Sequence, residues 1–585
     1  MKLLKFNIAF LFTLCLTFQS CLNMDPEDQL ADGNMWQNPG QYELFTKQFY
    51  SWLRDFNGLG GPHGDIRSDL LTESPRNIYS NGTYSIPLTD GNYTGAYTNL
   101  RQVNLLLKNS KSYPLPNDIK VPVGEAYFFR AYIYFDLLQL YGGVIKVEEP
   151  LDIVSPELYV RQNTREEIVE FIISDLNNAI ERLPEYSTIT AANTGCLSVE
   201  AAQAFLSRVG LYAGTWEKFH NGNGQNTELS KKWLKIAYEA AYKVIESGTF
   251  EIFKPEGLMN IADDPGAAYR YLFILENERS NPANGITKSS NKEYILSKRH
   301  DTTLAPIGIN ITEGRFNNAI HFTRKFANLY LQRSTGLPID TRTWKYEELG
   351  SEYLDRDNRM SAIMMINGGY YFSSTKGWRT TWLGDQAERD AAKLTPFNPV
   401  GGTGYHYRKW CAEREVEKTK EGYDYPVIRY AEVLLNYAES KFECDDNISD
   451  EDLRISLNLV RSRVNPAMPA LTNGLLKNSG TNMRTEIRRE RTVELIDEGF
   501  RLDDLKRWKT AEYEMPDDLL GIKYTGTAFE TAGWTGVTVN QDGCLIWERG
   551  RQWDNKQYLY PLPIDQLQLN PNLQPNWQNT NPYSK

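Results

Sequence analysis

The sequence has few of the side chains on which catalytic and metal sites usually depend. Its 585 residues include 6 Cys and 5 scattered His, without a Cys-x-x-Cys pair. The Gly-x-Ser-x-Gly, Gly-x-x-x-x-Gly-Lys-Ser/Thr and His-Glu-x-x-His patterns are missing too. Paired acids could hydrolyse glycosides, but chance alone produces such pairs among 75 Asp and Glu. We therefore expect a protein that is not an enzyme and has no cofactor.

A calcium site is not expected either. The stretch Asp355-Arg-Asp357-Asn-Arg359 begins like a calcium loop. Arg359 and Met360 then stand where that loop requires an oxygen ligand and a glycine. The sequence predicts no metal ligands.

The chain also lacks an excess of positive charge and a long apolar run. Lys and Arg number 64 against 75 Asp and Glu, a formal net charge of −11, which excludes the basic surface that nucleic-acid binding needs. The apolar run Ile8–Phe18 is far shorter than the roughly 20 residues that span a bilayer, and no later stretch approaches that length. Residues 1–20, with Lys2 and Lys5 before the apolar run, are instead typical of a secretory signal peptide.

The end of this segment predicts a lipid anchor. Ser20 directly before Cys21 is similar to a bacterial lipobox, in which the cysteine is acylated and becomes the new amino terminus. Phe18 and Gln19 depart from the usual lipobox residues, so an ordinary signal peptide with a free Cys21 is the alternative. Diacylglycerol together with an N-acyl chain such as palmitate would anchor the protein firmly, because more than one chain is attached.

Residues 21–40 are expected to form a linker behind this anchor. Asp25, Glu27 and Asp28 resemble the export tag of surface lipoproteins in some Gram-negative bacteria, which would place the protein on the outer face of the outer membrane. A merely solvated linker is the alternative. The remaining cysteines are far apart and are expected to be buried small hydrophobic residues: Cys196, Cys411, Cys444 and Cys544.

Periodic apolar residues predict a mainly helical protein. Thr164 and Glu167 form a capping-box pattern before a helix that Pro184 ends, and a second amphipathic helix runs from Trp233 to Ile245. Segments 125–143 and 200–214 precede these two helices and predict helix-pair repeats that resemble degenerate tetratricopeptide repeats. A further helix is predicted over 425–442 and another helical region over 490–507, and their many charges are interpreted as a solvated or salt-bridged structural face.

These patterns divide the mature chain into three regions. Residues 41–255 are the helical-repeat region, 256–424 are rich in glycine, proline, polar residues and aromatic clusters with few strand signals, and 425–585 are a carboxy-terminal region expected to pack on the helical scaffold. Rigid scaffolds usually present binding residues on loops, so region 256–424 is the expected ligand-binding part. Trp216, Trp233 and Trp508 lie in helical patterns and are assigned to the core.

Four blocks of sequence resemble the SusD/RagB family of nutrient-uptake lipoproteins. They stand in the family's order at 125–143, 425–439, 486–508 and 558–573, and together with the lipoprotein-like start they cover nearly the whole chain. The resemblance implies tetratricopeptide-like helix pairs carrying a loop-rich ligand-binding portion. It also implies a protein tethered to the outer leaflet that captures an oligomeric nutrient and acts as a lid on a SusC-like TonB-dependent transporter.

Sugar chemistry suggests which residues would contact the ligand. The C–H faces of sugar rings lie on Trp and Tyr, while their hydroxyls hydrogen-bond to Asp, Asn and Arg. Among 35 Tyr and 13 Trp, most rings belong to helix packing, so only those in loops are candidates, and ordinary packing remains the alternative for each. The predicted contacts are Asp32, Asn34, Trp36, Asp65, Arg67, Asp69, Tyr79, Asn81, Tyr84, Trp378, Arg379, Trp382, Tyr405 and Tyr407.

Three functions stay open on the sequence. The favoured one is a surface lipoprotein that delivers an oligosaccharide or polysaccharide to the transporter. Aromatic pockets also accept peptides, so the same role with a peptide ligand is the first alternative. A helical-repeat scaffold that only holds partner proteins is the second.

Overall fold

The computed structural model describes residues 35–73, 77–259, 264–277, 286–312, 315, 320–367, 370–371, 378–381, 395–396, 402–412, 417, 419–531 and 536–577. The predicted signal peptide, Cys21, Asp32, Asn34 and Trp382 lie outside these residues. Across the described ranges, no helix combines the length and apolarity that crossing a membrane requires.

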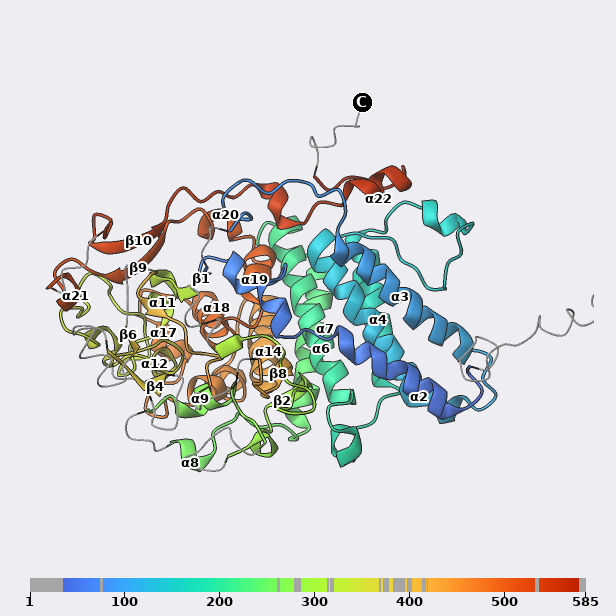
Figure 1. Cartoon of the computed structure of the whole chain (residues 1–585), viewed down its shortest axis with the longest axis horizontal. Helices are drawn as coiled ribbons and strands as arrows, with labels where there is room; N and C mark the ends of the chain where they lie inside the picture. The colour runs from blue at the N-terminus through green and yellow to red at the C-terminus, as the bar shows by residue number, and fades with distance from the viewer. Residues whose placement is uncertain are drawn as a thin grey trace, which may run out of the picture.

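The amino-terminal half is a row of antiparallel helices. Short α2 (Pro39–Lys47) packs on α4, and each long helix packs against the next in the chain, as the blue to green ribbons of Figure 1 show. The prediction of a mainly helical protein is confirmed. The long helices are α3 (Gly91–Ser110), α4 (Lys120–Tyr141), α5 (Arg165–Ile180), α6 (Val199–Trp216) and α7 (Glu228–Glu246).

Local sequence explains where these helices start and how closely they pack. The capping box predicted for α5 is present: the Thr164 hydroxyl accepts the N–H of Glu167, and the Glu167 carboxylate accepts the N–H of Thr164. Helices α6 and α7 approach closely at Gly210 and Gly214. A Cβ at Gly214 would lie only 2.6 Å from Leu234 Cγ on α7.

The loop-rich and carboxy-terminal regions contain short elements. Among the described residues there are four small sheets: β1–β3–β7, β4–β5–β6, the β9–β10 hairpin and the pair β2–β8. The helices are α8 (Glu256–Met259), α9 (Ala267–Tyr271), α11 (Arg324–Leu329), α12 (Asn358–Ile363), α14 (Tyr430–Asp445), α15 (Asp450–Arg454), α16 (Leu457–Arg461), α17 (Asn473–Leu476), α18 (Met483–Glu494), α19 (Arg501–Arg507), α20 (Ala511–Glu514), α21 (Ala528–Thr531) and α22 (Ile564–Leu569). The strands are β1 (Leu71–Thr72), β2 (Tyr294–Lys298), β3 (His321–Phe322), β4 (Tyr370–Tyr371), β5 (Trp378–Thr381), β6 (Thr395–Pro396), β7 (Tyr405–His406), β8 (Tyr425–Arg429), β9 (Leu519–Lys523) and β10 (Cys544–Glu548).

One predicted helix is corrected at its start, and one predicted helical region is resolved into two helices. Residues 425–429 form strand β8 rather than the first turn of a helix, because Pro426 and the β-branched Val427 and Ile428 favour an extended chain that pairs with β2. Region 490–507 is two helices, α18 and α19. Asp497 (φ 57°) and Gly499 (φ 78°) adopt the left-handed conformation between them, which ends α18 and turns the chain.

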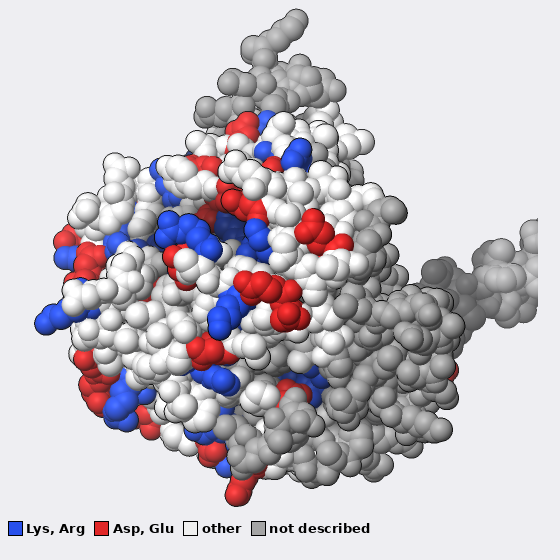
Figure 2. Space-filling model, turned by 90° about the vertical axis from the view of Figure 1, so that its left-hand side faces the viewer, with Lys and Arg blue, Asp and Glu red and all other residues white. Residues whose placement is uncertain are grey.

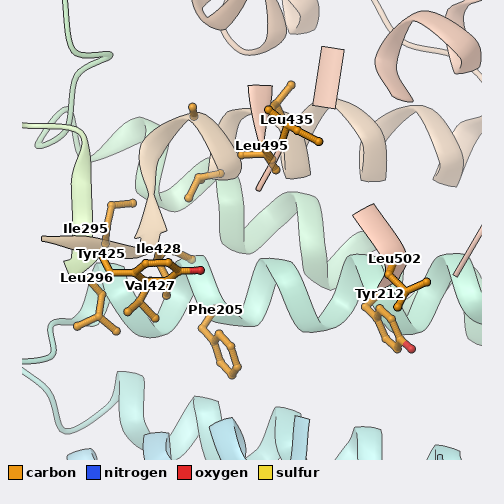
Figure 3. Close-up of a cluster of buried hydrophobic side chains, with 14 of the residues drawn as sticks. Phe205, Tyr212, Ile295, Leu296, Tyr425, Val427, Ile428, Leu435, Leu495 and Leu502 are labelled. Atoms are coloured by element: carbon orange, nitrogen blue, oxygen red, sulfur yellow. The ribbon is translucent and has the colours of Figure 1, made fainter. Parts of the chain in front are cut away.

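One continuous core joins the regions. Figure 3 shows Ile295 and Leu296 of β2 with Val427 and Ile428 of β8, close to Phe205 on α6. Helix α14 packs on both α6 and α7, so the carboxy-terminal region is in direct contact with the helical row. The assignment of Trp216, Trp233 and Trp508 to the core is confirmed. Cys411, Cys444 and Cys544 are buried as predicted, whereas Cys196 is only half-buried.

The charges of α14 and α18 form a buried ion-pair network, which confirms the salt-bridged interpretation. Arg429 lies 2.9 Å from Glu293, 2.7 Å from Glu494 and 2.7 Å from Glu498, and Arg463 joins the same Glu293 and Glu494. Further buried pairs connect α14 to α6 and α19: Arg208 with Glu432 at 2.6 Å and Arg507 with Glu439 at 2.6 Å. The network ties loops of region 256–424 to the helical frame.

Candidate functional site

A cavity of about 750 Å³ opens between α11, the segment 341–347 and the β9–β10 hairpin. Figure 2 looks onto the side of the molecule where β9 and β10 lie in Figure 1, and a hollow flanked by blue and red side chains opens on this face. The volume falls within the range of about 300–1,000 Å³ that is usual for ligand sites. The lining residues that bear on its chemistry are Asp69, Arg324, Lys325, Asn328, Thr341, Arg342, Trp344, Tyr346, Glu347, Asp517, Asp518, Lys523, Thr525, Thr527, Asn540 and Asp542.

Close backbone packing positions the hairpin that forms one wall. Ile522 N–H donates to the carbonyl of Thr403 at 2.8 Å. A Cβ at Gly521 would lie 2.0 Å from that same carbonyl oxygen, so only glycine fits there. The hairpin is therefore held against the strand segment that leads into β7.

Two aromatic rings line the cavity and are held in place by neighbouring side chains. Trp344 is half-buried, its indole N–H donates to the carbonyl of Glu352 at 3.2 Å, and the Arg356 guanidinium lies 5.3 Å from its ring centre. The guanidinium of Arg324 lies 4.7 Å from the ring centre of the half-buried Tyr346. Because these contacts already hold both side chains in place, the rings would lose little side-chain entropy when a ligand packs against them.

Paired charges make up the floor. Lys325 Nζ lies 3.1 Å from Asp69 Oδ2 and 3.1 Å from Asp517 Oδ2, and Arg501 binds Asp69 through both carboxylate oxygens. Burial alone would raise the pKa of Asp69, but Arg501 and Lys325 outweigh it and hold the pKa below its ordinary value. Burial opposes the charge on Lys325, yet Asp69 and Glu514 raise its pKa. Both groups are therefore charged near neutral pH.

The remaining lining is polar and offers hydrogen bonds. Asn328 Oδ1 is buried and has no hydrogen-bond donor among the described residues, and Thr341, Thr525, Thr527 and Asn540 add hydroxyl and amide groups. Within the ranges that the structure covers, no group of three or more His, Cys, Asp or Glu side chains could hold a metal ion. An aromatic wall facing polar groups can bind a hydroxyl-bearing molecule with apolar faces.

Four predicted contacts are corrected because they are fully buried. Asp65 accepts the N–H groups of Asp497 and Arg501, and burial together with the neighbouring Asp497 raises its pKa to about 8. Tyr407 donates to Asp497 at 2.5 Å. These residues hold the interior together, and a ligand in solvent does not reach them: Asp65, Tyr79, Tyr405 and Tyr407.

Two of the predicted residues nevertheless belong to the cavity or support it. Asp69 is also fully buried, and it lies beneath the floor, where it contacts Lys325. Tyr405 lies behind the wall, where its hydroxyl donates to Glu352 at 2.7 Å and accepts from Arg324 at 3.2 Å. Sequence reasoning missed Trp344 and Tyr346 as contacts. The only available signal was their place in the aromatic, loop-rich region.

The other predicted contacts lie elsewhere. Arg67 donates to the Tyr560 hydroxyl, and Tyr79 and the half-buried Tyr84 pack on the same ring with centroids 5.5 and 5.6 Å away. Asn81 is half-buried next to them. Trp36 packs on Tyr42 at α2, and for Trp378 and Arg379 the structure describes only the backbone of β5.

Comparison with known proteins identifies the fold. The family model described as "SusD family" matches residues 275–583, more than half of the chain. The chain belongs to the SusD family. A second family model, described as "Starch-binding associating with outer membrane", matches residues 73–211 of this SusD-family protein.

Relatives in sequence are distant. A "SusD-like protein" of Bacteroides ovatus is 26% identical over 268 residues, 43% of this chain and about half, 47%, of that relative. "SusD-like protein P38" of Formosa agariphila is 21% identical over 530 residues, which cover 87% of this chain and 92% of that protein.

Solved structures show the same fold across most of the chain. A crystal structure titled as a SusD-like carbohydrate binding protein from Bacteroides fragilis has a TM-score of 0.72 at 21% identity, covering 92% of this chain and 99% of that one. A structure titled as being with xylogluco-oligosaccharide has a TM-score of 0.62 at 18% identity, covering 93% and 99%. At such identities the likeness concerns the fold.

Proposed function

We propose that this SusD-family protein is a surface lipoprotein that binds an oligosaccharide or polysaccharide. The observation that carries the proposal is the cavity beside the β9–β10 hairpin, in which Trp344 and Tyr346 face polar and charged side chains. Sugar rings match this arrangement, because their C–H faces can cover the rings while hydroxyls bond to the polar lining. The carbohydrate binding named for the Bacteroides fragilis structure and the bound xylogluco-oligosaccharide support the same ligand class.

The cellular role follows from the family and the amino terminus. Cys21 would carry the lipids, the acids behind it would direct the protein outward, and the family name places relatives at the outer membrane. The protein would then act as a lid that delivers its ligand to a SusC-like TonB-dependent transporter, without catalysis of its own. For ligands longer than the cavity, further contacts are proposed at Asp32, Asn34, Trp36, Arg67, Asn81, Tyr84, Trp378, Arg379 and Trp382.

Titration calorimetry tests the proposal. The purified chain is titrated with a series of oligosaccharides and with a peptide mixture, and saturable heat is expected with glycans. Trp344→Ala should weaken the binding. If a sugar covers on the order of 80 Å² of the ring, the variant loses about 2 kcal/mol of binding free energy, which is about 30-fold in affinity.

Controls separate binding from folding. Tyr242→Ala removes a ring that is 42% exposed on α7, far along the chain from the cavity walls, and should leave affinity unchanged. Thermal midpoints of both variants are measured alongside. Saturable heat with peptides alone would replace the glycan by a peptide ligand, and no heat with either class would contradict the proposed binding role.

A further inference from the structure

We infer that the cavity selects neutral glycans and excludes those that carry uronate or sulfate groups. This rests on the proposed function and names the class of glycan. The cavity holds four cationic side chains, and an anionic sugar would need at least one of them to be available. Those four are Arg324, Lys325, Arg342 and Lys523.

Lys325 and Arg324 already lie beside carboxylates of the protein. Lys325 contacts Asp69 and Asp517 on the floor. Arg324 lies 3.9 Å from Glu352, and burial, which opposes its charge, is outweighed by Tyr405 and Glu352, so its pKa is raised. A sugar carboxylate would have to displace a protein carboxylate that is already in place.

The other two cations are held at the rim. Arg342 is paired with Asp340 through two contacts of 3.0 and 3.1 Å in an exposed turn. The Lys523 ammonium donates to the carbonyl of Asp542 at the end of the hairpin. Among the described lining residues, each guanidinium group has a partner of its own, so the bidentate recognition typical of anionic groups would require that partner to be displaced.

The lining carboxylates are less completely paired than the cations. Five carboxylates line the cavity, and for Glu347 and Asp542 no Lys or Arg nitrogen lies within salt-bridge distance among the described residues. Both side chains are exposed. The Asp518 carboxylate lies 4.0 Å from Arg549 and accepts the N–H of Gly550 at 3.3 Å. These groups would repel an approaching uronate or sulfate at close range, where salt screens poorly.

The same carboxylates can accept hydrogen bonds from the hydroxyl groups of a neutral sugar. An ionised carboxylate only accepts hydrogen bonds, and a neutral sugar offers several O–H donors. Asn328 Oδ1 adds an acceptor that lacks a donor among the described residues. Both blue and red side chains lie around the hollow in Figure 2, and the whole chain has a net charge of −11, so the overall charge does not favour a polyanion.

A glycan array followed by calorimetry tests the inference. The array carries neutral polysaccharides, among them xyloglucan and galactomannan, and acidic ones, among them polygalacturonate and carrageenan. The protein should bind a neutral glycan at least tenfold more tightly than any acidic one, with an affinity that changes less than twofold between 20 and 300 mM NaCl, as rough thresholds. Tight, salt-sensitive binding of an acidic glycan would overturn the inference while leaving glycan binding intact. Binding to no glycan of either class would overturn the proposed function as well.

A double variant tests the cause. Glu347→Gln with Asp542→Asn keeps the shape of both side chains and removes their charge. We expect about three- to tenfold weaker binding of the neutral glycan, because charge-assisted hydrogen bonds are lost. The affinity for the acidic probes should rise measurably. Glu451→Gln on α15 removes an exposed acid away from the cavity and is the matched control. Unchanged discrimination in the double variant would show that these acids do not set it.

Discussion

Substitution of Arg463 by methionine tests whether the buried ion-pair network holds the protein together. Arg463 is fully buried, with Nη1 2.5 Å from Glu293 Oε2 and Nη2 2.8 Å from Glu494 Oε1. Methionine fills most of the same volume but leaves both carboxylates short of a partner. Removing one member of a buried ion pair costs about 3–5 kcal/mol. Since Arg429 remains 2.9 Å from Glu293 and 2.7 Å from Glu494, we expect the lower end, about 3 kcal/mol.

The pH dependence gives a second readout. Burial would raise the pKa of Glu494, but Arg463, Arg429 and Arg359 hold it at about 2, below the ordinary value of 4.5. A lowered pKa stabilises the fold above pH 4.5 and loses that contribution as the pH falls toward 2. At about 1.4 kcal/mol per pH unit, the contribution is about 3 kcal/mol. In Arg463→Met one of the three guanidinium groups is gone, so the pKa of Glu494 should rise and acid unfolding should begin at a higher pH.

Equilibrium unfolding in urea, followed by tryptophan fluorescence between pH 7 and pH 4, measures both effects. The midpoint of Arg463→Met should fall at an unchanged slope, and the difference from the wild type should be largest at pH 7 and narrow as the pH drops, because protonation of Glu494 relieves the unpaired carboxylate. Arg454→Met is the control, because Arg454 forms an exposed pair with Glu451 on α15, 2.6 Å apart, and should leave the midpoint unchanged. A midpoint for Arg463→Met that equals the wild-type value, or an acid transition that does not move, would refute the reasoning.

Three further predictions concern packing, anchoring and ligand contact. Gly214→Ala places a Cβ 2.6 Å from a leucine side chain of α7 and should lower the thermal midpoint, whereas Gly95→Ala, with nothing within 4 Å of the added Cβ, should not. Cys21→Ala should move the protein from the membrane fraction to the soluble fraction, and continued lipid labelling of the variant would show that the anchor lies elsewhere. The double change Trp378→Ala and Trp382→Ala should weaken glycan affinity in calorimetry with a nearly unchanged thermal midpoint; unaltered affinity or a large loss of stability would assign both rings to structure.

The helical row could be predicted because its signals are local. The capping box at Thr164 and the apolar periodicity to Leu183 lie within one segment, and the structure places α5 there. Strand β8 could not be separated from α14 in the same way. Its pairing with β2 joins residues more than a hundred positions apart, such as Tyr294 and Arg429, and no local pattern encodes such a partner.

The cavity was harder to predict for a related reason. Its walls come from α11, from the segment around Trp344 and from the β9–β10 hairpin, so it exists only once three distant segments meet. Candidate acids and rings in loops were chosen by residue type alone. Asp65 and Tyr407 show the weakness of that choice, because the interior uses both as hydrogen-bond partners of Asp497 or its neighbours. Residue type indicates which chemistry is available, and packing decides whether it faces solvent.

The residues that carry the family resemblance are not the ones that line the cavity. Block 425–439 supplies Arg429, Glu432 and Glu439 to the buried network, and block 486–508 supplies Glu494 and Arg507, all within salt-bridge distance of their partners. The cavity is built from residue 69, from 323–347 and from 517–544, which lie outside all four blocks. The charges of these two blocks therefore hold the scaffold together. The proposed ligand specificity is tested instead at the cavity walls, where Trp344, Glu347 and Asp542 can be changed without touching the network.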